Sequence, residues 1–214
     1  NGDYVFTTDE KSDAYIGSYD ISDLNNIQEV DRIQSNAGSN SIPHNVHVDG
    51  NFLITSYYRD GTVVHDITHP NNLIQVASFD SSPLSGDGFD GCWGTYPYLP
   101  SGNIISSDIN SGSGNNGRLF VYSRDFQQAC YLEGNVTDLS NSIALTNATI
   151  EIINPLTTIS SSTDLSGNYF SGIVYQGTYD IIFSSPGYLT DTISAILTNG
   201  NTTVINAQLQ PLVS

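Results

Sequence analysis

The chain has 214 residues, and its 22 Asp and Glu against 5 Lys and Arg give a formal net charge of −17. Charge of this sign repels duplex nucleic acid and anionic membrane surfaces, so we expect neither as a partner. This acidity, with many Gly, Asn, Ser and Thr residues and no Met, favours a secreted soluble β-protein. No apolar run is long enough to span a bilayer and no signal peptide opens the chain, so an exported protein would be a mature, processed or truncated form.

Three carboxylates stand close together near the start of the chain, at Asp9, Glu10 and Asp13. Hard oxygen ligands on a flexible loop can hold calcium, so these residues form a candidate metal site. Calcium is the one cofactor that this pattern indicates. The alternative is an exposed turn whose carboxylates are only solvated.

A four-stranded antiparallel unit is predicted between Ser41 and Phe79. Its alternating apolar runs are separated by turn residues such as Asp49-Gly50-Asn51. The third run ends at Pro70, because proline lacks the amide hydrogen that a sheet ladder needs. The predicted strands are His44–Val48, Phe52–Tyr58, Thr62–Ile67 and Leu73–Phe79.

The same unit recurs on both sides of this stretch. Gly2–Thr8 aligns with Gly50–Ser56, which in turn aligns with Gly102–Asp108. A repeat period in the upper forties with four strands per repeat is typical of a β-propeller blade. We therefore predict an all-β chain that begins with a partial β-propeller of between two and three four-stranded blades. A plain row of hairpins in a sandwich is less favoured, because sandwiches do not repeat at a fixed period.

A second set of short strands follows Arg124. Seven such strands predict a seven-stranded β-sandwich, so we divide the chain into residues 1–129, the propeller blades, and residues 130–214, the sandwich. The predicted strands are Tyr131–Thr137, Thr149–Ile153, Thr158–Thr163, Asn168–Ile173, Gly177–Ser184, Tyr188–Leu197 and Thr202–Gln210.

Two family resemblances rest on these segments. HNVHVDGN, SYYRDG, HDITHPNN and DGCWGTYPYLPSGNIISSDINSG resemble the LVIVD-type propeller of the choice-of-anchor B family of bacterial surface proteins, over residues 1–124. LEGNVTD, TDLSGNYF and GTYDIIFSSPGY resemble the carboxypeptidase regulatory-like domain, which has a transthyretin-like fold. The first resemblance implies that the chain is a fragment with C-terminal blades only. The remaining propeller blades then come from an N-terminal part of the same polypeptide or from another chain. The second implies an accessory or spacer module without catalytic residues.

The two cysteines, Cys92 and Cys130, allow one disulfide, which an oxidising compartment would preserve. Two independent buried thiols are the equally weighted alternative, because the sequence does not report how far apart the two residues lie.

Aromatic residues near predicted strand ends are the candidate ligand-binding residues. They are Trp93, Tyr57, Tyr58, His44 and His47. Rings with an apolar body and a polar edge suit sugar or protein ligands, whereas packing between blades is the alternative for Trp93. His44 and His47 lie three positions apart on a predicted strand and so face opposite sides, which disfavours a shared metal site and favours hydrogen-bonded structural histidines.

The sequence contains neither a GxSxG nucleophile motif nor an HExxH metal motif, and we identify no enzyme in it. We predict a non-catalytic protein, secreted or on the bacterial outer surface, that uses the propeller as a binding or interaction face for a surface protein or glycan. The sandwich is then a spacer before an anchor. One alternative is a metal-dependent hydrolase or lyase with its site at the propeller channel. The other is a structural subunit of a surface assembly.

Overall fold

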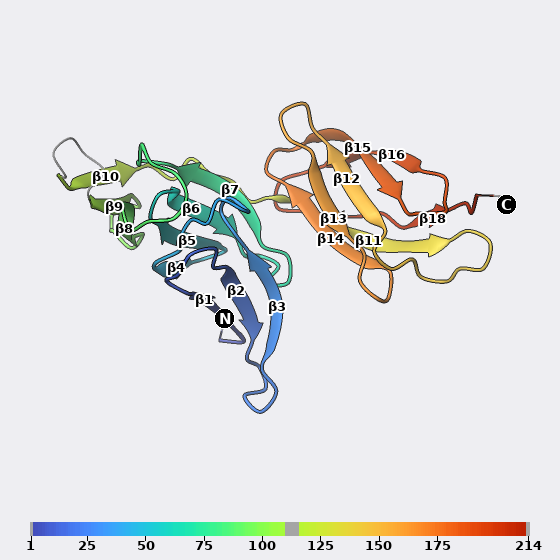
Figure 1. Ribbon diagram of the computed structural model, residues 1–214, viewed down its shortest axis with the longest axis horizontal. Coiled ribbons are helices and arrows are strands. Elements are labelled where there is room, and N and C mark those ends of the chain that lie inside the picture. Colours follow the sequence, from blue (N-terminus) through green and yellow to red (C-terminus); the bar gives the residue numbers. More distant parts are fainter. Residues whose placement is uncertain (1, 110–115, 213–214) are drawn as a thin grey trace. The chain divides into compact units, whose positions relative to one another are not determined.

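Short runs of alternating side chains, separated by glycine and asparagine turns, form β-strands and no helix in the described residues, 2–109 and 116–212 of the computed structural model (Figure 1). The predicted all-β class is therefore confirmed for this part of the chain. No helix that could cross a membrane is found there. The chain divides into two compact units, Asn1–Phe126 and Gln127–Ser214.

The first unit contains three antiparallel sheets, and the strands of each are paired in chain order. The first sheet holds β1 (Tyr4–Thr8), β2 (Ile16–Asp20) and β3 (Gln28–Ile33); the second holds β4 (Val46–Asp49), β5 (Phe52–Tyr57), β6 (Gly61–Asp66) and β7 (Ile74–Phe79); the third holds β8 (Gly91–Tyr96), β9 (Ile104–Ile109) and β10 (Arg118–Tyr122). The predicted four-stranded unit is thus the second sheet, and the sheets before and after it have three strands each among the described residues.

The second sheet is covered on both of its faces. On one face, Leu53 and Val63 pack with Ile16 of the first sheet in a buried apolar cluster. On the other face, the Thr62 hydroxyl lies 2.7 Å from the Ser106 hydroxyl of the third sheet. This position between two sheets explains why β5 and β6 are buried along nearly their whole length and do not alternate between buried and exposed residues.

Among the described residues, one apolar face of the third sheet is largely exposed. Val121 pairs with Ile105, which pairs with Tyr96, so these side chains lie on the same side of the sheet. Leu119, two positions before Val121, lies on that side as well. Leu119 is 68% exposed and Val121 is 61% exposed. We call Tyr96, Ile105, Leu119 and Val121 the open face.

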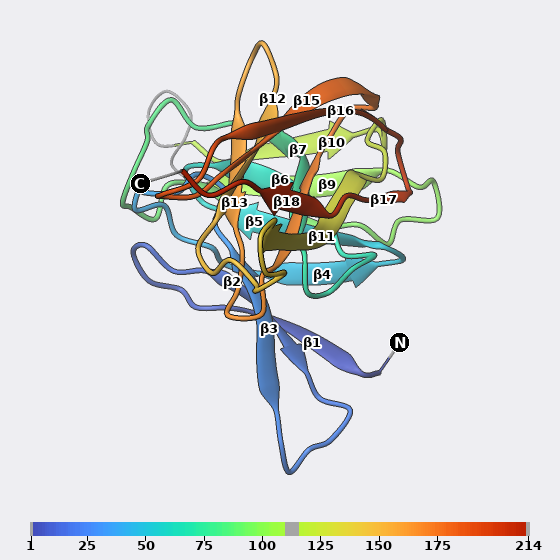
Figure 2. The same cartoon turned by 90° about the vertical axis from the view of Figure 1, so that its right-hand side faces the viewer.

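The second unit consists of two further sheets. Its strands are β11 (Cys130–Asp138), β12 (Thr149–Ile153), β13 (Ile159–Ser162), β14 (Asn168–Ile173), β15 (Gly177–Ser184), β16 (Asp191–Leu197), β17 (Thr202–Val204) and β18 (Ala207–Leu209). One sheet has the order β14-β11-β17, with β18 also paired to β11, and the other has the order β13-β12-β15-β16. In Figure 2, β15 and β16 lie side by side, and β11 of the other sheet lies apart from them.

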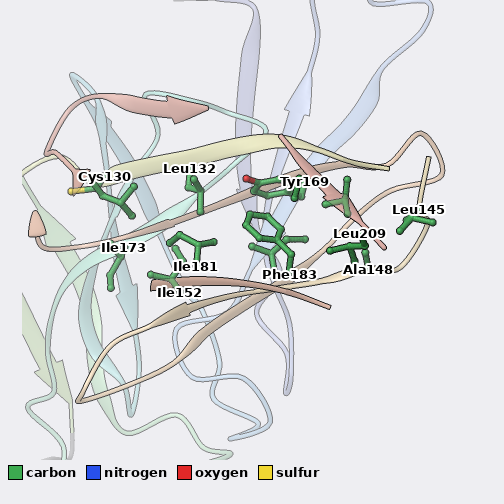
Figure 3. Close-up of a cluster of buried hydrophobic side chains, with 14 residues drawn as sticks. Cys130, Leu132, Leu145, Ala148, Ile152, Tyr169, Ile173, Ile181, Phe183 and Leu209 are labelled. Atoms are coloured by element: carbon green, nitrogen blue, oxygen red, sulfur yellow. The ribbon is translucent and has the colours of Figure 1, made fainter. Parts of the chain in front are cut away.

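A single apolar core fills the second unit, and both sheets contribute to it. Leu132 and Tyr169 come from one sheet, and Ile152 and Phe183 from the other (Figure 3). The rings of Tyr169 and Phe183 meet edge to face with their centroids 5.8 Å apart. The core is therefore made entirely from residues of this unit.

The last predicted strand, Thr202–Gln210, is split in two. Its first part, β17, pairs with β11 at Tyr131–Glu133, and its second part, β18, pairs further along β11. Between them the Ile205 amide donates to the Glu133 carbonyl at 2.9 Å. A Cβ atom at Gly134 would overlap the Ile205 carbonyl oxygen, so this close approach of the β17–β18 segment to β11 requires glycine.

Candidate binding site

An exposed tryptophan stands at an irregularity in β8. The pairing of β8 with β9 shifts between Cys92 and Gly94, which makes Trp93 the extra residue of a β-bulge. Bulges redirect a side chain away from the regular alternation of a strand. Trp93 is 49% exposed, and it is the single tryptophan of the chain.

Trp93 is the first of four aromatic rings that contact one another in succession. The His44 ring stacks on Trp93 with centroids 5.3 Å apart and an angle of 29° between the planes. His44 also meets Tyr58 at 5.3 Å, and Tyr58 meets Phe89 edge to face at 5.2 Å. We call Trp93, His44, Tyr58 and Phe89 the aromatic row. Tyr58 is buried inside it, whereas Phe89 at the far end is 55% exposed.

The carboxylate of Glu10, from the loop between β1 and β2, lies at the middle of the aromatic row. The Tyr58 hydroxyl donates to Glu10 Oε1 at 2.5 Å, and His44 Nε2 lies 3.5 Å from the same oxygen. Burial, together with the Glu10 carboxylate, raises the pKa of Tyr58 well above its ordinary value. Tyr58 therefore remains a hydrogen-bond donor to a carboxylate that is still 47% exposed.

Backbone contacts hold the row together. The His44 amide donates to the Ser56 carbonyl, and the Cys92 amide donates to the Tyr58 carbonyl, at 2.9 and 2.8 Å respectively. Gly91 has a φ of 94°, and a Cβ atom there would overlap the Tyr58 carbonyl oxygen. The glycine before the bulge thus lets β8 approach the end of β5 and places Trp93 beside the other rings.

Arg59 fixes the loop that carries Phe89. Its guanidinium group pairs with Asp90 at 2.7 Å and donates to the Ser85 carbonyl at 3.1 Å. A Cβ atom at Gly88 would overlap this guanidinium group, so the arginine lies directly across the loop backbone. Phe89 lies between these contacts and is held beside Tyr58.

The structure brings together three of the five predicted ligand residues, namely Trp93, Tyr58 and His44. Tyr57 is instead buried in the core, where its hydroxyl donates to the Ala14 carbonyl at 3.2 Å. His47 meets a different ring, Tyr98, edge to face at 5.8 Å. Tyr57 therefore has a structural position, and His47 lies outside the aromatic row.

The structure does not bring the three predicted calcium ligands together. Asp9 pairs with Lys11 at 2.6 Å, Glu10 accepts from Tyr58, and Asp13 accepts from the Gln34 amide at 2.9 Å. Within residues 2–109 and 116–212, no group of three or more His, Cys, Asp or Glu side chains is arranged to hold a metal ion.

Both cysteines are free and buried. Cys92 lies 3.4 Å from the Thr62 hydroxyl in the first unit, and Cys130 belongs to the core of the second unit. Burial raises the pKa of each thiol to about 11. The sequence left a bridge and two buried thiols as equal alternatives, and the structure contains two free, buried thiols.

The sequence analysis did not select Phe89, and it assigned Glu10 to a metal site. Phe89 is an apolar residue within the glycine-rich and aspartate-rich loop from Gly86 to Gly91. A bulky apolar side chain without core periodicity is the signal that would have indicated an exposed contact residue. No local signal connects Glu10 with Tyr58, which lies 48 positions along the chain.

Comparison with known proteins finds a family model that is similar to the second unit. Residues 131–210 match the family model of the carboxypeptidase regulatory-like domain, as the sequence resemblance predicted. No curated protein matches the chain.

Three solved structures show distant similarity. A minor pilin of Streptococcus agalactiae shares 13% identity and a TM-score of 0.35, over 56% of this chain and 64% of that chain. The TIE protein of Bacillus anthracis shares 12% identity and a TM-score of 0.35, over 99% of this chain and 41% of that chain. A pilus 2b backbone protein of group B streptococcus shares 13% identity and a TM-score of 0.33, over 97% of this chain and 81% of that chain. The chain spans less than two thirds of the first two proteins, and scores this low carry no argument about function.

Proposed function

We propose that this chain is part of a non-catalytic bacterial surface protein, in which the first unit presents a binding face and the second is a spacer before an anchor. The observation that carries the proposal is the aromatic row with Glu10 at its middle. Trp93 and Phe89 expose ring surface, and the row has a carboxylate beside it. This combination of apolar surface and an orienting polar group is typical of sites for sugars or proteins.

The polar groups of the site are suited to binding. The raised pKa of Tyr58 keeps its hydroxyl protonated near neutral pH, so this residue donates a hydrogen bond and does not act as a base. Arg59 is paired with Asp90 and serves to hold the loop of Phe89. These groups orient one another and keep the exposed rings in place, which is the arrangement that a preformed binding site needs.

We also propose that the first unit is the C-terminal part of a β-propeller. Three antiparallel sheets in chain order, with the second packed on both faces by its neighbours, support this architecture. The exposed Leu119 and Val121 of the open face support further sheets beyond the third. Those sheets come from an N-terminal part of the same polypeptide or from another chain.

The spacer role of the second unit is supported by its family match and by its closed core. In this proposal its two sheets form a transthyretin-like β-sandwich. Such a module contributes length and stability between a binding domain and its attachment, because its core does not depend on a partner.

Substitution within the aromatic row tests the binding function. We expect Trp93→Ala to weaken binding of the protein to its surface glycan or protein ligand at least about tenfold. Aromatic side chains that become buried on binding contribute most of the binding energy in such interfaces. Tyr175→Ala is the matched control, since Tyr175 is an exposed aromatic residue of the second unit. A screen of immobilised oligosaccharides and surface proteins with both variants is the measurement. Equal binding by the two variants would contradict the proposal.

A further inference from the structure

The first sheet (β1, β2 and β3, blue in Figure 1) carries a groove on the face that points away from the second sheet. Ile16 packs against the second sheet, so the next residue, Gly17, faces the groove on the other side. The groove has a volume of about 380 Å³, which is within the usual range of small-molecule sites. Asp9 and Lys11, which also line it, are the chain neighbours of Glu10 in the aromatic row. The groove therefore reaches the loop end of the sheet, the end that is open at the aromatic row as well.

A tyrosine ring lies over the floor of this groove. A Cβ atom added at Gly17 would lie 2.7 Å from Cε2 of Tyr19 and 3.0 Å from its hydroxyl oxygen, so the ring occupies the space above the glycine. Thr7 and Arg32 pair with Gly17 from the two neighbouring strands, which places their side chains on either side of this ring. Glycine at this position thus lets an aromatic surface lie close to the sheet, where it can pack against the C–H face of a sugar ring.

Two exposed ion pairs line the groove. Lys11 Nζ lies 2.6 Å from the Asp9 carboxylate, and Arg32 Nε lies 2.5 Å from the Glu29 carboxylate. The Arg32 guanidinium group also lies over the ring of Tyr15, 5.3 Å from its centroid, which holds this side chain in place. Exposed ion pairs contribute little to stability. These two pairs therefore serve better as hydrogen-bonding groups for a ligand than as supports of the fold.

The groove is close to neutral although the chain is strongly acidic. Two of the five Lys and Arg residues of the chain line it together with three carboxylates, and these five residues are Lys11, Arg32, Asp9, Asp13 and Glu29. Donors and acceptors are therefore presented side by side. Two neighbouring hydroxyl groups of a sugar can satisfy both members of an ion pair, since each hydroxyl both donates and accepts.

The groove offers no apolar pocket for a peptide side chain. Among its described lining residues Ala14 is the single aliphatic one, and it is 3% exposed. Protein ligands bind mainly through a few large side chains that fill well-packed pockets. The lining consequently favours a ligand rich in hydroxyl groups over a peptide.

We propose that this groove is a second binding site, distinct from the aromatic row, and that its ligand is a neutral oligosaccharide. One sugar ring packs on Tyr19, and its hydroxyl groups bond to the two ion pairs. The net charge of −17 repels an acidic sugar. A cationic sugar gains little, because the carboxylate of each pair already has a cation beside it.

Nuclear magnetic resonance of the native protein tests this proposal. The probes are cellotetraose, mannotetraose and a galactose tetramer, with tetragalacturonate as the acidic counterpart of the last. Binding in the groove should shift the amide signals of Gly17 and Arg32, whereas the indole signal of Trp93 reports separately on the aromatic row. We expect at least one neutral tetramer to bind at least about tenfold more tightly than tetragalacturonate.

Two variants probe the groove, each with a matched control. Arg32→Gln should weaken binding of the neutral tetramer at least about tenfold, because it removes a charged donor. Arg118→Gln, at an exposed arginine of β10, should leave the affinity unchanged. Gly17→Ala displaces the Tyr19 ring and should also weaken binding, whereas Gly177→Ala changes a glycine beneath a tyrosine ring of the second unit and should not. Thermal melts show which variants remain folded.

The outcomes separate this site from the proposed function. Unshifted Gly17 and Arg32 signals with every neutral tetramer at millimolar concentration, or unchanged binding by Arg32→Gln, would overturn the groove site. A response of the Trp93 signal alone would overturn it as well, while supporting the aromatic row. Tighter binding of tetragalacturonate, or of a glutamate-rich or lysine-rich peptide, than of the neutral tetramers would overturn the assignment to a neutral sugar.

Discussion

His65 is a buried histidine without a polar partner. It lies on β6, opposite Leu53 of the buried apolar cluster, and neither ring nitrogen has a hydrogen bond. Because burial penalises the charged imidazolium, the pKa of His65 is lowered from 6.5 to about 3. Folded His65 therefore stays neutral at pH values where the unfolded chain binds a proton.

This shift predicts acid sensitivity of the first unit. The contribution of neutral His65 to the free energy of unfolding is fully present above pH 6.5. It is lost as the pH falls from 6.5 toward about 3. Each pH unit in this window costs about 1.4 kcal/mol. His65→Leu should flatten the dependence, measured by urea unfolding of the native protein at several pH values. His47→Leu, at a partly exposed position, is the control, and a slope unchanged by His65→Leu would refute the argument.

The buried thiols predict slow chemical modification. Cys92 and Cys130 are fully buried, and burial raises the pKa of each to about 11. The reactive thiolate is therefore scarce as well as inaccessible. We expect both cysteines of the native protein to resist alkylation and to react together on unfolding, as measured by mass spectrometry. A native mass lower by two hydrogens than the reduced mass would show the bridge instead.

At the scale of elements, the loop between β1 and β2 uses its carboxylates for protein contacts. Asp9, Glu10 and Asp13 bond to Lys11, Tyr58 and Gln34 respectively. We therefore expect millimolar calcium, added after chelation, to leave the melting temperature unchanged. A ligand that binds only the folded state raises the melting temperature, so a clear increase would restore the calcium site.

The pairing of β17 and β18 alongside β11 depends on the absence of a side chain at Gly134. Gly134→Ala forces a methyl group against the Ile205 carbonyl, so we expect a loss of about 2 kcal/mol or more in the free energy of unfolding. Gly177→Ala is the control, because the atoms nearest to its added Cβ belong to the Tyr179 ring, a side chain able to shift. Urea unfolding of the two variants is the measurement, and similar losses in both would contradict this account.

For the whole molecule, the two units should differ in whether each folds when it is expressed alone. The second unit has a core drawn entirely from its own residues, whereas the first leaves Leu119 and Val121 of its open face uncovered. We expect residues 127–214, expressed alone, to unfold cooperatively as a monomer. Residues 1–124 alone should associate or lack a cooperative transition, because an uncovered apolar sheet is unstable in water. Sedimentation and calorimetry measure both, and a stable monomer of residues 1–124 would refute the incomplete propeller.

Local patterns were enough to predict the all-β class and most strand positions. Alternation and turn residues are properties of neighbouring positions, so the strands of the second sheet and the carboxypeptidase regulatory-like domain were recognisable from the sequence. The split of the last predicted strand was missed, since it depends on the approach of Ile205 to Gly134.

The candidate site, in contrast, was decided by tertiary structure. Glu10, His44, Tyr58, Phe89 and Trp93 come from separate loops and strands, and only the packing of the sheets and the bulge in β8 bring them together. Tyr57 and Tyr58 are neighbours in sequence, yet one faces the core and the other the aromatic row. Alternation shows that successive residues face opposite sides of a strand, but what covers each side is determined by residues far away in the sequence.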